Sequence, residues 1–300
     1  MVRLAAIISA GVLGLAFGSF LNVCVSRWPE GESAIKPRSH CRSCGRTLAW
    51  WENLPLLSWL ALRGHCRSCK APIGWRYPLV ELAVAAFWAF TAWQIFVWAP
   101  ELKSGAVSYA GAEALAEGVA QMIFFWLLVA LAVLDKEHLW LPDRLTLPGI
   151  GLGLALALTR ASITAVMLWH GDIGAWEHFA GTAAGTWFLG AMISGGVVMV
   201  IRLVYNFFRG EEGMGFGDVK LMAMLGGWTG MTGGLLALGI GAVAGAATVL
   251  VARLFSRKRT PDENWWLSQV PFGTFLCLGG VASALWRVPI IAAYQSWAGF

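Results

Sequence analysis

Long apolar runs separated by short polar connections dominate the pattern of this chain. The apolar segments lie near 4–26, 79–99, 118–134, 145–168, 179–201, 219–233, 235–252 and 271–293. About 20 apolar residues in a helix cross the hydrocarbon core of a bilayer. The pattern therefore predicts an all-α integral membrane protein with about eight transmembrane helices.

The stretch 219–252 allows two interpretations. Its 34 residues would form a straight helix of about 50 Å, against a hydrocarbon core of about 30 Å. The sequence Thr229-Gly230-Met231-Thr232-Gly233-Gly234 offers a turn in the middle. We expect a hairpin there, with a short first arm that either spans the membrane or is re-entrant.

One polar segment, residues 27–78, interrupts the apolar pattern and is rich in Cys, Arg, Pro and Trp. We predict three parts: a first transmembrane helix over 1–26, a small soluble module over 27–78, and a helical membrane domain over 79–300. The first helix could be taken for a signal peptide, but no small-residue cleavage site follows it, so we expect it to be retained.

Composition excludes a soluble protein. The chain is 58% hydrophobic and 13% charged, with a mean hydropathy of +0.64. The net charge of +5 and the 18 tryptophans are explained by anionic lipid and membrane interfaces. The lipid bilayer is thus an expected partner, and nucleic acid is not needed.

The distribution of basic residues predicts the topology. With the module in the cytoplasm and eight crossings, only Arg3, Lys103, Arg160 and Arg287 lie outside. All other lysines and arginines lie inside, as the positive-inside rule requires.

Two lone acids stand at the edges of apolar runs. Asp135 follows the run from Phe124 to Leu134, and Asp218 closes the stretch 213–218, which has glycine at 213, 215 and 217. Two crossings separate the acids, so both return to the cytoplasmic face and can meet. Acids in or near spans are rare and tend to face a bundle interior, although a pair of helix-end acids among headgroups is the alternative.

Two facing carboxylates suit aspartyl hydrolysis. One takes a proton from water while the other, protonated, polarises the scissile carbonyl, and the two share one proton. Gly215 and Gly217 are expected to let backbone leave helical geometry beside an extended substrate. Asp143 and Lys220 are given supporting roles, and Asp143 has the alternative of favouring a helix start through the helix dipole.

The polar module contains a repeat of cysteine pairs. His40-Cys41-Arg42-Ser43-Cys44 recurs as His65-Cys66-Arg67-Ser68-Cys69. Cys41, Cys44, Cys66 and Cys69 match a four-thiolate structural zinc site, with two disulfides or redox motifs as the alternative. The two histidines are expected outside the ligand set.

These motifs together resemble those of the bacterial prepilin peptidases, leader peptidase/N-methyltransferases of the GxGD aspartyl membrane protease type. The resemblance rests on these segments: Gly18-Ser19-Phe20-Leu21-Asn22-Val23, the paired CxxC motifs, Trp51-Glu52-Asn53-Leu54-Pro55, Arg76-Tyr77-Pro78-Leu79-Val80-Glu81, Asp135 to Asp143, Glu212 to Lys220, and Pro271-Phe272-Gly273.

The resemblance implies that Asp135 and Asp218 are the catalytic pair of an inner-membrane enzyme whose site faces the cytoplasm. It implies cleavage of a type IV prepilin or type II secretion pseudopilin after a glycine that ends a basic leader. It also implies methylation of the new amino terminus from S-adenosylmethionine, for which we find no independent motif.

Four further residues are candidates for substrate or cofactor contacts. Asn22 could equally be a polar packing residue of a helix, and Glu81 could simply favour a helix start. Glu211 and Glu212 could steer a basic leader, or belong to a solvated loop.

Two other functional classes compete with the peptidase. An ion-coupled transporter would also use buried acids and glycine-containing helices, but its acids would lie near the midplane, and no repeat of spans is evident. A zinc-held scaffold without catalysis would leave both aspartates unexplained.

Overall fold

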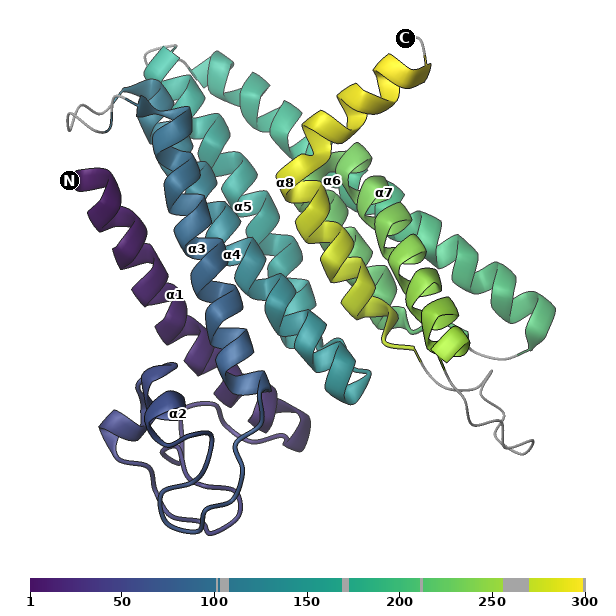
Figure 1. The fold of residues 1–300 in the computed structure, drawn as a ribbon. Coiled ribbons are helices and arrows are strands. Elements are labelled where there is room, and N and C mark those ends of the chain that lie inside the picture. The colour runs from purple at the N-terminus through teal and green to yellow at the C-terminus, as the bar shows by residue number, and fades with distance from the viewer. Residues whose placement is uncertain (101, 103–107, 169–172, 211–212, 256–269, 299–300) are drawn as a thin grey trace. The chain divides into compact units, whose positions relative to one another are not determined.

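The computed structural model describes residues 1–100, 102, 108–168, 173–210, 213–255 and 270–298 (Figure 1). Within these residues every regular element is a helix, apart from two isolated β-bridges in the polar module. Those long and apolar enough to span a membrane are α1 (Val2–Arg27), α3 (Arg76–Trp98), α4 (Tyr109–His138), α5 (Asp143–Leu168), α6 (Ile173–Arg209), α7 (Phe216–Phe255) and α8 (Phe272–Ala298). The prediction of an all-α membrane protein is confirmed.

The chain forms two compact units, Met1–Ala130 and Leu131–Phe300, and the boundary falls inside α4. The first unit holds α1, the polar module, α3 and most of α4. The second holds the end of α4 and α5 to α8. The predicted division at residues 26 and 78 is a finer one and stays a prediction.

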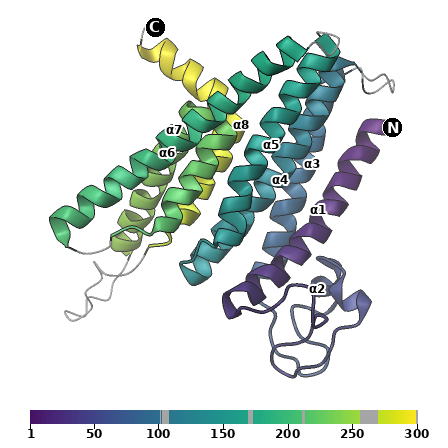
Figure 2. The ribbon, with the colours of Figure 1, turned by 180° about the vertical axis from the view of Figure 1, so that it is seen from behind.

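Antiparallel packing of α1 against α3 organises the first unit (Figure 2). A Cβ added to Gly14 would lie 2.7 Å from the Cα of Ala85, and one added to Gly18 would lie 2.7 Å from the Cα of Glu81. A real Cβ does not come this close to backbone, so glycine at these positions sets how closely the helices approach.

Helix α4 packs against both helices through tryptophans. Trp126 donates its indole N–H to the carbonyl of Phe17 in α1, at 3.2 Å, and Trp88 in α3 donates to the carbonyl of Met122, at 3.0 Å. Phe87 and Phe125 stack with ring centroids 4.6 Å apart. These contacts hold the three helices of the first unit together.

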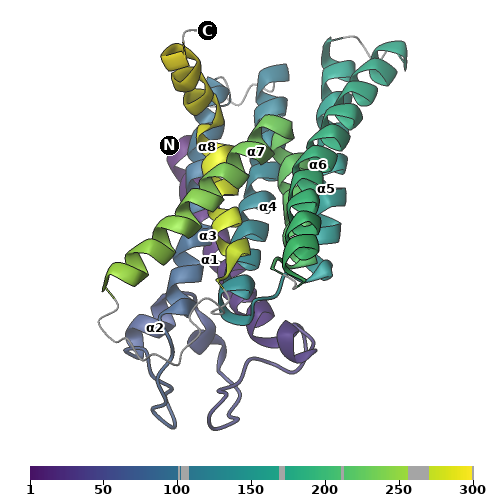
Figure 3. The ribbon, with the colours of Figure 1, turned by 90° about the vertical axis from the view of Figure 1, so that its right-hand side faces the viewer.

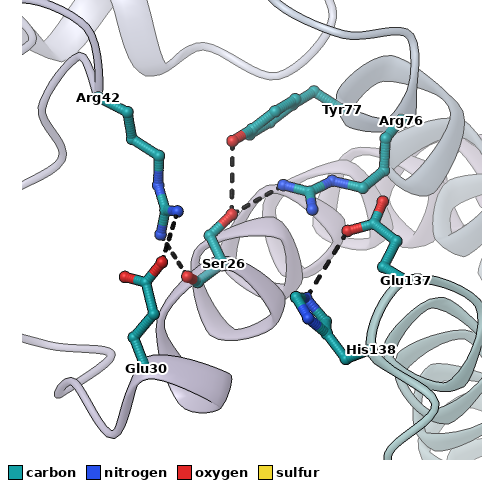
Figure 4. A network of polar contacts seen from close by, with 7 residues as sticks. All are labelled: Ser26, Glu30, Arg42, Arg76, Tyr77, Glu137 and His138. Carbon is teal, nitrogen blue, oxygen red and sulfur yellow. Dashed lines mark hydrogen bonds and ion pairs between the residues drawn. The ribbon is translucent and has the colours of Figure 1, made fainter.

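The polar module contains η1 (Trp28–Glu30), η2 (Trp50–Asn53) and α2 (Leu57–Ala61). Figure 4 shows how it is tied to the end of α1: Arg42 reaches the Ser26 carbonyl and pairs with Glu30, while Arg76 donates to the Ser26 hydroxyl. Arg27 donates to the carbonyls of module residues Ser33 and Arg38. The module is therefore anchored to the helix that precedes it.

Small residues also bring α6 and the first arm of α7 together in the second unit. A Cβ on Gly226 would lie 2.1 Å from the carbonyl oxygen of Gly190 and 2.4 Å from Oγ of Ser194. Ser194 is fully buried. Such close backbone approach is typical of helix pairs in membranes.

Helix α7 reverses at Gly230, whose φ of 74° and ψ of 174° lie outside helical geometry. A Cβ on Gly234 would lie 2.9 Å from the Cα of Gly226, whereas residues eight apart on a straight helix are about 12 Å apart. The segment 219–252 therefore folds back on itself at the predicted turn. This reversal accounts for the difference between seven long helices and about eight predicted segments, and whether the short first arm spans the bilayer stays a prediction.

The second arm of α7 packs on α8 (Figure 3). A Cβ on Gly279 would lie 2.1 Å from the carbonyl oxygen of Ala237, and one on Gly241 would lie 2.9 Å from that of Phe275. At the reversal, Arg287 of α8 donates to the Thr229 carbonyl and Ser283 donates to the Gly233 carbonyl, the latter at 2.8 Å. Irregular backbone inside a membrane protein needs such partners.

Candidate active site and metal centre

Asp135 lies one turn before the end of α4 and is 5% exposed. Its Oδ2 accepts two hydrogen bonds from Thr274, one from the backbone N–H at 2.6 Å and one from the hydroxyl at 3.0 Å. Thr274 belongs to the first turn of α8, where backbone N–H groups have no partner within the helix. The start of α8 thus holds the Asp135 carboxylate in place.

Asp218 lies in the first turn of α7 and is 7% exposed. Its side chain interacts electrostatically with that of Asp135. The buried thiol of Cys277, in α8, lies within electrostatic range of both carboxylates. The structure therefore brings together the two acids that the sequence analysis paired.

Leu141 packs against both glycines that lie beside the two acids, Gly217 in α7 and Gly273 in α8. A Cβ on Gly217 would lie 2.9 Å from Cβ of Leu141, and one on Gly273 would lie 3.0 Å from Cδ1 of Leu141 and 2.9 Å from Cγ of Asp135. Larger residues at either glycine would push α7 or α8 away from the end of α4. The two glycines thus act by allowing close approach.

The glycines near Asp218 divide at the start of α7. Gly213 and Gly215 precede the helix, whereas Gly217 is part of it, so the expected departure from helical geometry holds for Gly215 and not for Gly217. None of the three has the left-handed φ that would require glycine. A Cβ on Gly213 would instead collide with the ring of Tyr205, at 2.1 Å. Around Gly215 the nearest side-chain atom is Oδ2 of Asp218, at 3.9 Å, so a methyl group there would border the carboxylate.

Asp143 and Lys220 form an ion pair between the starts of α5 and α7. Asp143 is the first residue of α5, as its interpretation as a helix-start acid requires. The ammonium of Lys220 also lies 4.9 Å from the centroid of the Phe216 ring. The ion pair therefore links the start of α5 to the start of α7, where Asp218 lies.

The four module cysteines converge on one point. Their Sγ atoms all lie within 4.8 Å of one another, and Cys41 and Cys69 are 3.7 Å apart. A tetrahedral zinc ion with Zn–S distances of about 2.3 Å places its sulfurs about 3.8 Å apart. A disulfide needs about 2.0 Å, and all four thiols are free. The donor set therefore fits a closed four-thiolate metal site.

The repeat in the sequence gives two equivalent turns around this point. Cys41 accepts a backbone hydrogen bond from Gly45 and donates to Arg46, and Cys66 in the same way pairs with Lys70 and Ala71. His40 and His65 instead place Nδ1 beside backbone carbonyls, so the cluster consists of cysteines, as expected.

Backbone donors favour the thiolate form that binds metal. The N–H groups of Cys69 and Ser68 lower the pKa of the Cys66 thiol to about 6. For Cys69 the Ala71 N–H lowers the pKa, but burial and the neighbouring thiols outweigh it and raise the pKa to about 11. Neighbouring thiolates disfavour a further negative charge, and a divalent cation would remove that penalty.

Asn22 and Glu81 lie in the first unit and are 2% and 6% exposed. Asn22 donates to the Tyr77 carbonyl at 2.9 Å. Glu81 lies beyond the first turn of α3 and accepts the N–H of Leu56 at 2.8 Å, so its interpretation as a helix-start acid is wrong. Glu211 and Glu212 lie outside the described residues.

The sequence analysis did not predict the structural roles of two residues, Thr274 and Glu52. Thr274 follows Pro271-Phe272-Gly273, a motif that was noted, but a threonine at a helix start carries no signal of its own. Glu52, in a noted motif, pairs with Arg46 at 2.5 Å and accepts the Ala49 N–H at 2.8 Å. The Arg46 guanidinium beside it lowers the pKa of the Glu52 carboxyl.

Known protein families match both parts of the chain. Residues 12–95 match the bacterial peptidase A24 N-terminal domain, and residues 122–250 match the type IV leader peptidase family. The latter range includes Asp135 and Asp218, and the former includes all four module cysteines.

Individual relatives match along nearly the whole chain, and all three described here are named prepilin leader peptidase/N-methyltransferase. The protein of Stutzerimonas stutzeri is 32% identical over 98% of this chain and 96% of its own. That of Pseudomonas aeruginosa is 33% identical over 99% and 96%, and that of Burkholderia pseudomallei is 36% identical over 93% and 84%. A comparison with solved structures gave no match. By these matches the chain is a member of the type IV leader peptidase family.

Proposed function

We propose that this protein is a bifunctional prepilin peptidase. It cleaves the basic leader of a type IV prepilin or type II secretion pseudopilin after glycine and then methylates the new amino terminus. The observation that carries the peptidase half is the buried pair of Asp135 and Asp218, drawn from two helices that the sequence separates by two crossings. The names of the relatives support both halves.

Cleavage needs a base and an acid at the scissile carbonyl. Two hydrogen bonds from Thr274 fix Oδ2 of Asp135. Asp135 and Asp218 share one proton, so one takes a proton from water while the other polarises the carbonyl. The water oxygen bonds to the carbonyl carbon, and the amine leaves with a proton from the pair.

Methyl transfer follows on the amine that cleavage releases. S-adenosylmethionine supplies an activated methyl group on a sulfonium. The amine released by cleavage would accept this methyl group and give up a proton to solvent, and S-adenosylhomocysteine would be the leaving product. The pair of aspartates is not required for this step.

We further propose that the four module cysteines hold a structural zinc ion. All four ligand positions are filled by thiolates, whereas a catalytic zinc keeps one position open. The ion would hold residues 41–69 in place, and with four thiolate ligands it would keep no open position for a substrate.

We propose that the module and both aspartates lie at the cytoplasmic face of the bacterial inner membrane, which the distribution of lysine and arginine favours. A prepilin presents its leader on that side, so the proposed topology and substrate agree. The alternative of an ion-coupled transporter lacks support, because the relatives are named for peptidase and methyltransferase activities.

The test is incubation of the purified protein with a prepilin and measurement of the product mass. We expect loss of the leader, and a further gain of one methyl group when S-adenosylmethionine is added. Asp135→Asn and Asp218→Asn should each abolish cleavage while zinc content is retained, and the double variant should be no worse than either, because the residues act as a unit. Rapid cleavage by either single variant would refute the assignment.

A further inference from the structure

The first unit contains a cavity of about 310 Å³ between the end of α1, the start of α3 and the polar module. Its volume lies in the range of small-molecule sites. Among its lining residues are Ser19, Asn22, Trp59, Tyr77 and Glu81. It thus joins the Gly18-to-Val23 and Arg76-to-Glu81 motifs, for which the peptidase chemistry has no use.

Asn22 leaves a hydrogen-bond acceptor open in the wall of this cavity. Its amide nitrogen donates to Tyr77, but its Oδ1 is buried and has no partner within the described part of the chain. A buried acceptor without a donor is unfavourable, so its presence beside a cavity points to a ligand that donates.

Glu81 adds a buried carboxylate without a countercharge. Its hydrogen bonds come from the Leu56 N–H and the Ser19 hydroxyl, both neutral donors, and no cationic side chain of the described residues pairs with it. Burying a carboxylate is costly unless a cation compensates. A positively charged ligand in the cavity would supply that charge.

Glu52 shows what a purely structural acid in the same wall looks like. One of its oxygens is paired with Arg46 and the other is held by the Ala49 N–H. Its charge and its acceptors are therefore used within the protein, whereas those of Asn22 and Glu81 are not.

The aromatic walls add a second means of holding a cation. Trp59 is fixed by its indole N–H, which donates to the Ile73 carbonyl at 3.1 Å, and by contact with Trp75 at a centroid distance of 4.4 Å. Tyr77 is held near the Ser26 hydroxyl at 3.4 Å. Flat rings attract sulfonium and ammonium cations and stack on nucleobases.

We propose that this cavity binds S-adenosylmethionine, with Glu81 facing the cationic part and Oδ1 of Asn22 accepting from an amino group. The inference rests on the methyltransferase activity in the proposed function, and it names the place where the methyl donor binds. A ligand with an adenine ring, a sulfonium and an ammonium group matches the flat walls, the free carboxylate and the open acceptor. Glu81 and Asn22 are binding residues in this assignment, and the methyl transfer itself uses the pilin amine.

The test measures binding of S-adenosylhomocysteine, the unreactive product, to full-length protein by calorimetry. The Asp135→Asn background removes cleavage, so binding is read independently of the peptidase. We expect about one site per chain, and affinity about tenfold weaker or more in Asn22→Ala and in Glu81→Gln. Thr91→Val is the matched control, because Thr91 is also buried in the first unit and its hydroxyl has no partner among the described residues, but it does not line the cavity. It should bind normally.

Two further measurements keep the outcomes distinct. Zinc content and thermal unfolding report whether each variant is folded, and ultraviolet crosslinking of tritiated S-adenosylmethionine to unsubstituted protein should label peptides within residues 19–81. Labelling elsewhere, or normal affinity in both cavity variants, would overturn the proposal. Slower prepilin cleavage by Asn22→Ala or Glu81→Gln in protein that retains Asp135, with unchanged ligand affinity, would assign the cavity to the substrate instead. A protein that binds the ligand but cleaves no prepilin would refute the peptidase function and leave the cavity assignment intact.

Discussion

Thr274 holds Asp135 through two groups at once, because its N–H and its hydroxyl both contact Oδ2 of the carboxylate. The hydroxyl also lies 3.0 Å from the carbonyl of Ala132, one turn earlier in α4. A single threonine thereby fixes the start of α8 to the helix that carries a proposed catalytic acid.

The first prediction follows from this contact. Thr274→Val keeps shape and the backbone N–H but removes the hydroxyl, and a hydrogen bond to a charged group contributes roughly 1.5–3 kcal/mol. We expect kcat for prepilin cleavage to fall about tenfold or more, with KM little changed, because the residue positions Asp135 without touching substrate. Thr274→Ser should restore most of the rate. Equal rates for the valine and serine variants would show that the hydroxyl has no such role.

The second prediction concerns the ion pair of Asp143 and Lys220. The Asp143 side chain is 56% exposed, and an exposed pair is worth about 0–1 kcal/mol. Asp143→Asn should therefore retain cleavage to within roughly fivefold of the unsubstituted protein, when kcat/KM is measured on the same prepilin. Inactivity as complete as that of Asp218→Asn would instead make Asp143 part of the catalytic machinery.

The third prediction concerns metal. Purified protein should contain about one zinc per chain by elemental analysis, and replacing any one of the four module cysteines by serine should release it. Binding energy at such a site is largely folding energy, so protease sensitivity of residues 27–78 should rise with zinc loss. Ser43→Ala, a change beside the ligands, is the control and should retain zinc. Full zinc content in Cys66→Ser would disprove the assignment.

The fourth prediction tests the packing of α6 on α7. Gly226→Ala places a methyl group where the Gly190 carbonyl and Ser194 lie, and overpacking of this kind costs about 1–3 kcal/mol. We expect a lower thermal unfolding temperature in detergent. Gly239→Ala, in the second arm of the same helix, meets no atom of the described residues within 4 Å and should be neutral or slightly stabilising. A lower unfolding temperature for Gly239→Ala than for Gly226→Ala would contradict the helix pairing described above.

Residue patterns predicted the features that depend on charge and repetition. Asp135 and Asp218 stood out because an acid beside an apolar run is rare, and Cys41 to Cys69 because paired thiols recur at a fixed interval. Features that depend on contact could not be predicted. Thr274 is an ordinary helix-start residue until α8 meets α4, and nothing in the sequence distinguishes Glu52, whose carboxylate is used internally, from Glu81, whose carboxylate faces a cavity.

The turn in α7 could be predicted only in part. A run of threonines and glycines at 229–234 made a reversal plausible, yet any of its glycines could have provided it. The position is decided by α8, whose Arg287 and Ser283 meet the carbonyls of Thr229 and Gly233. Tertiary contacts thus selected Gly230 from several locally equivalent positions.

These contacts also mean that the bend in α7 lacks its hydrogen-bond donors until α8 has been synthesised. The ribosome completes both arms of α7 before it makes α8, so the carbonyls of Thr229 and Gly233 leave the translocation machinery without their final partners. In hydrocarbon each unpaired carbonyl costs several kcal/mol, and water or lipid headgroups must hold the bend until the last helix arrives. A nascent chain stopped before residue 272 should therefore be a preferred substrate of membrane quality-control proteases, although it already contains both aspartates.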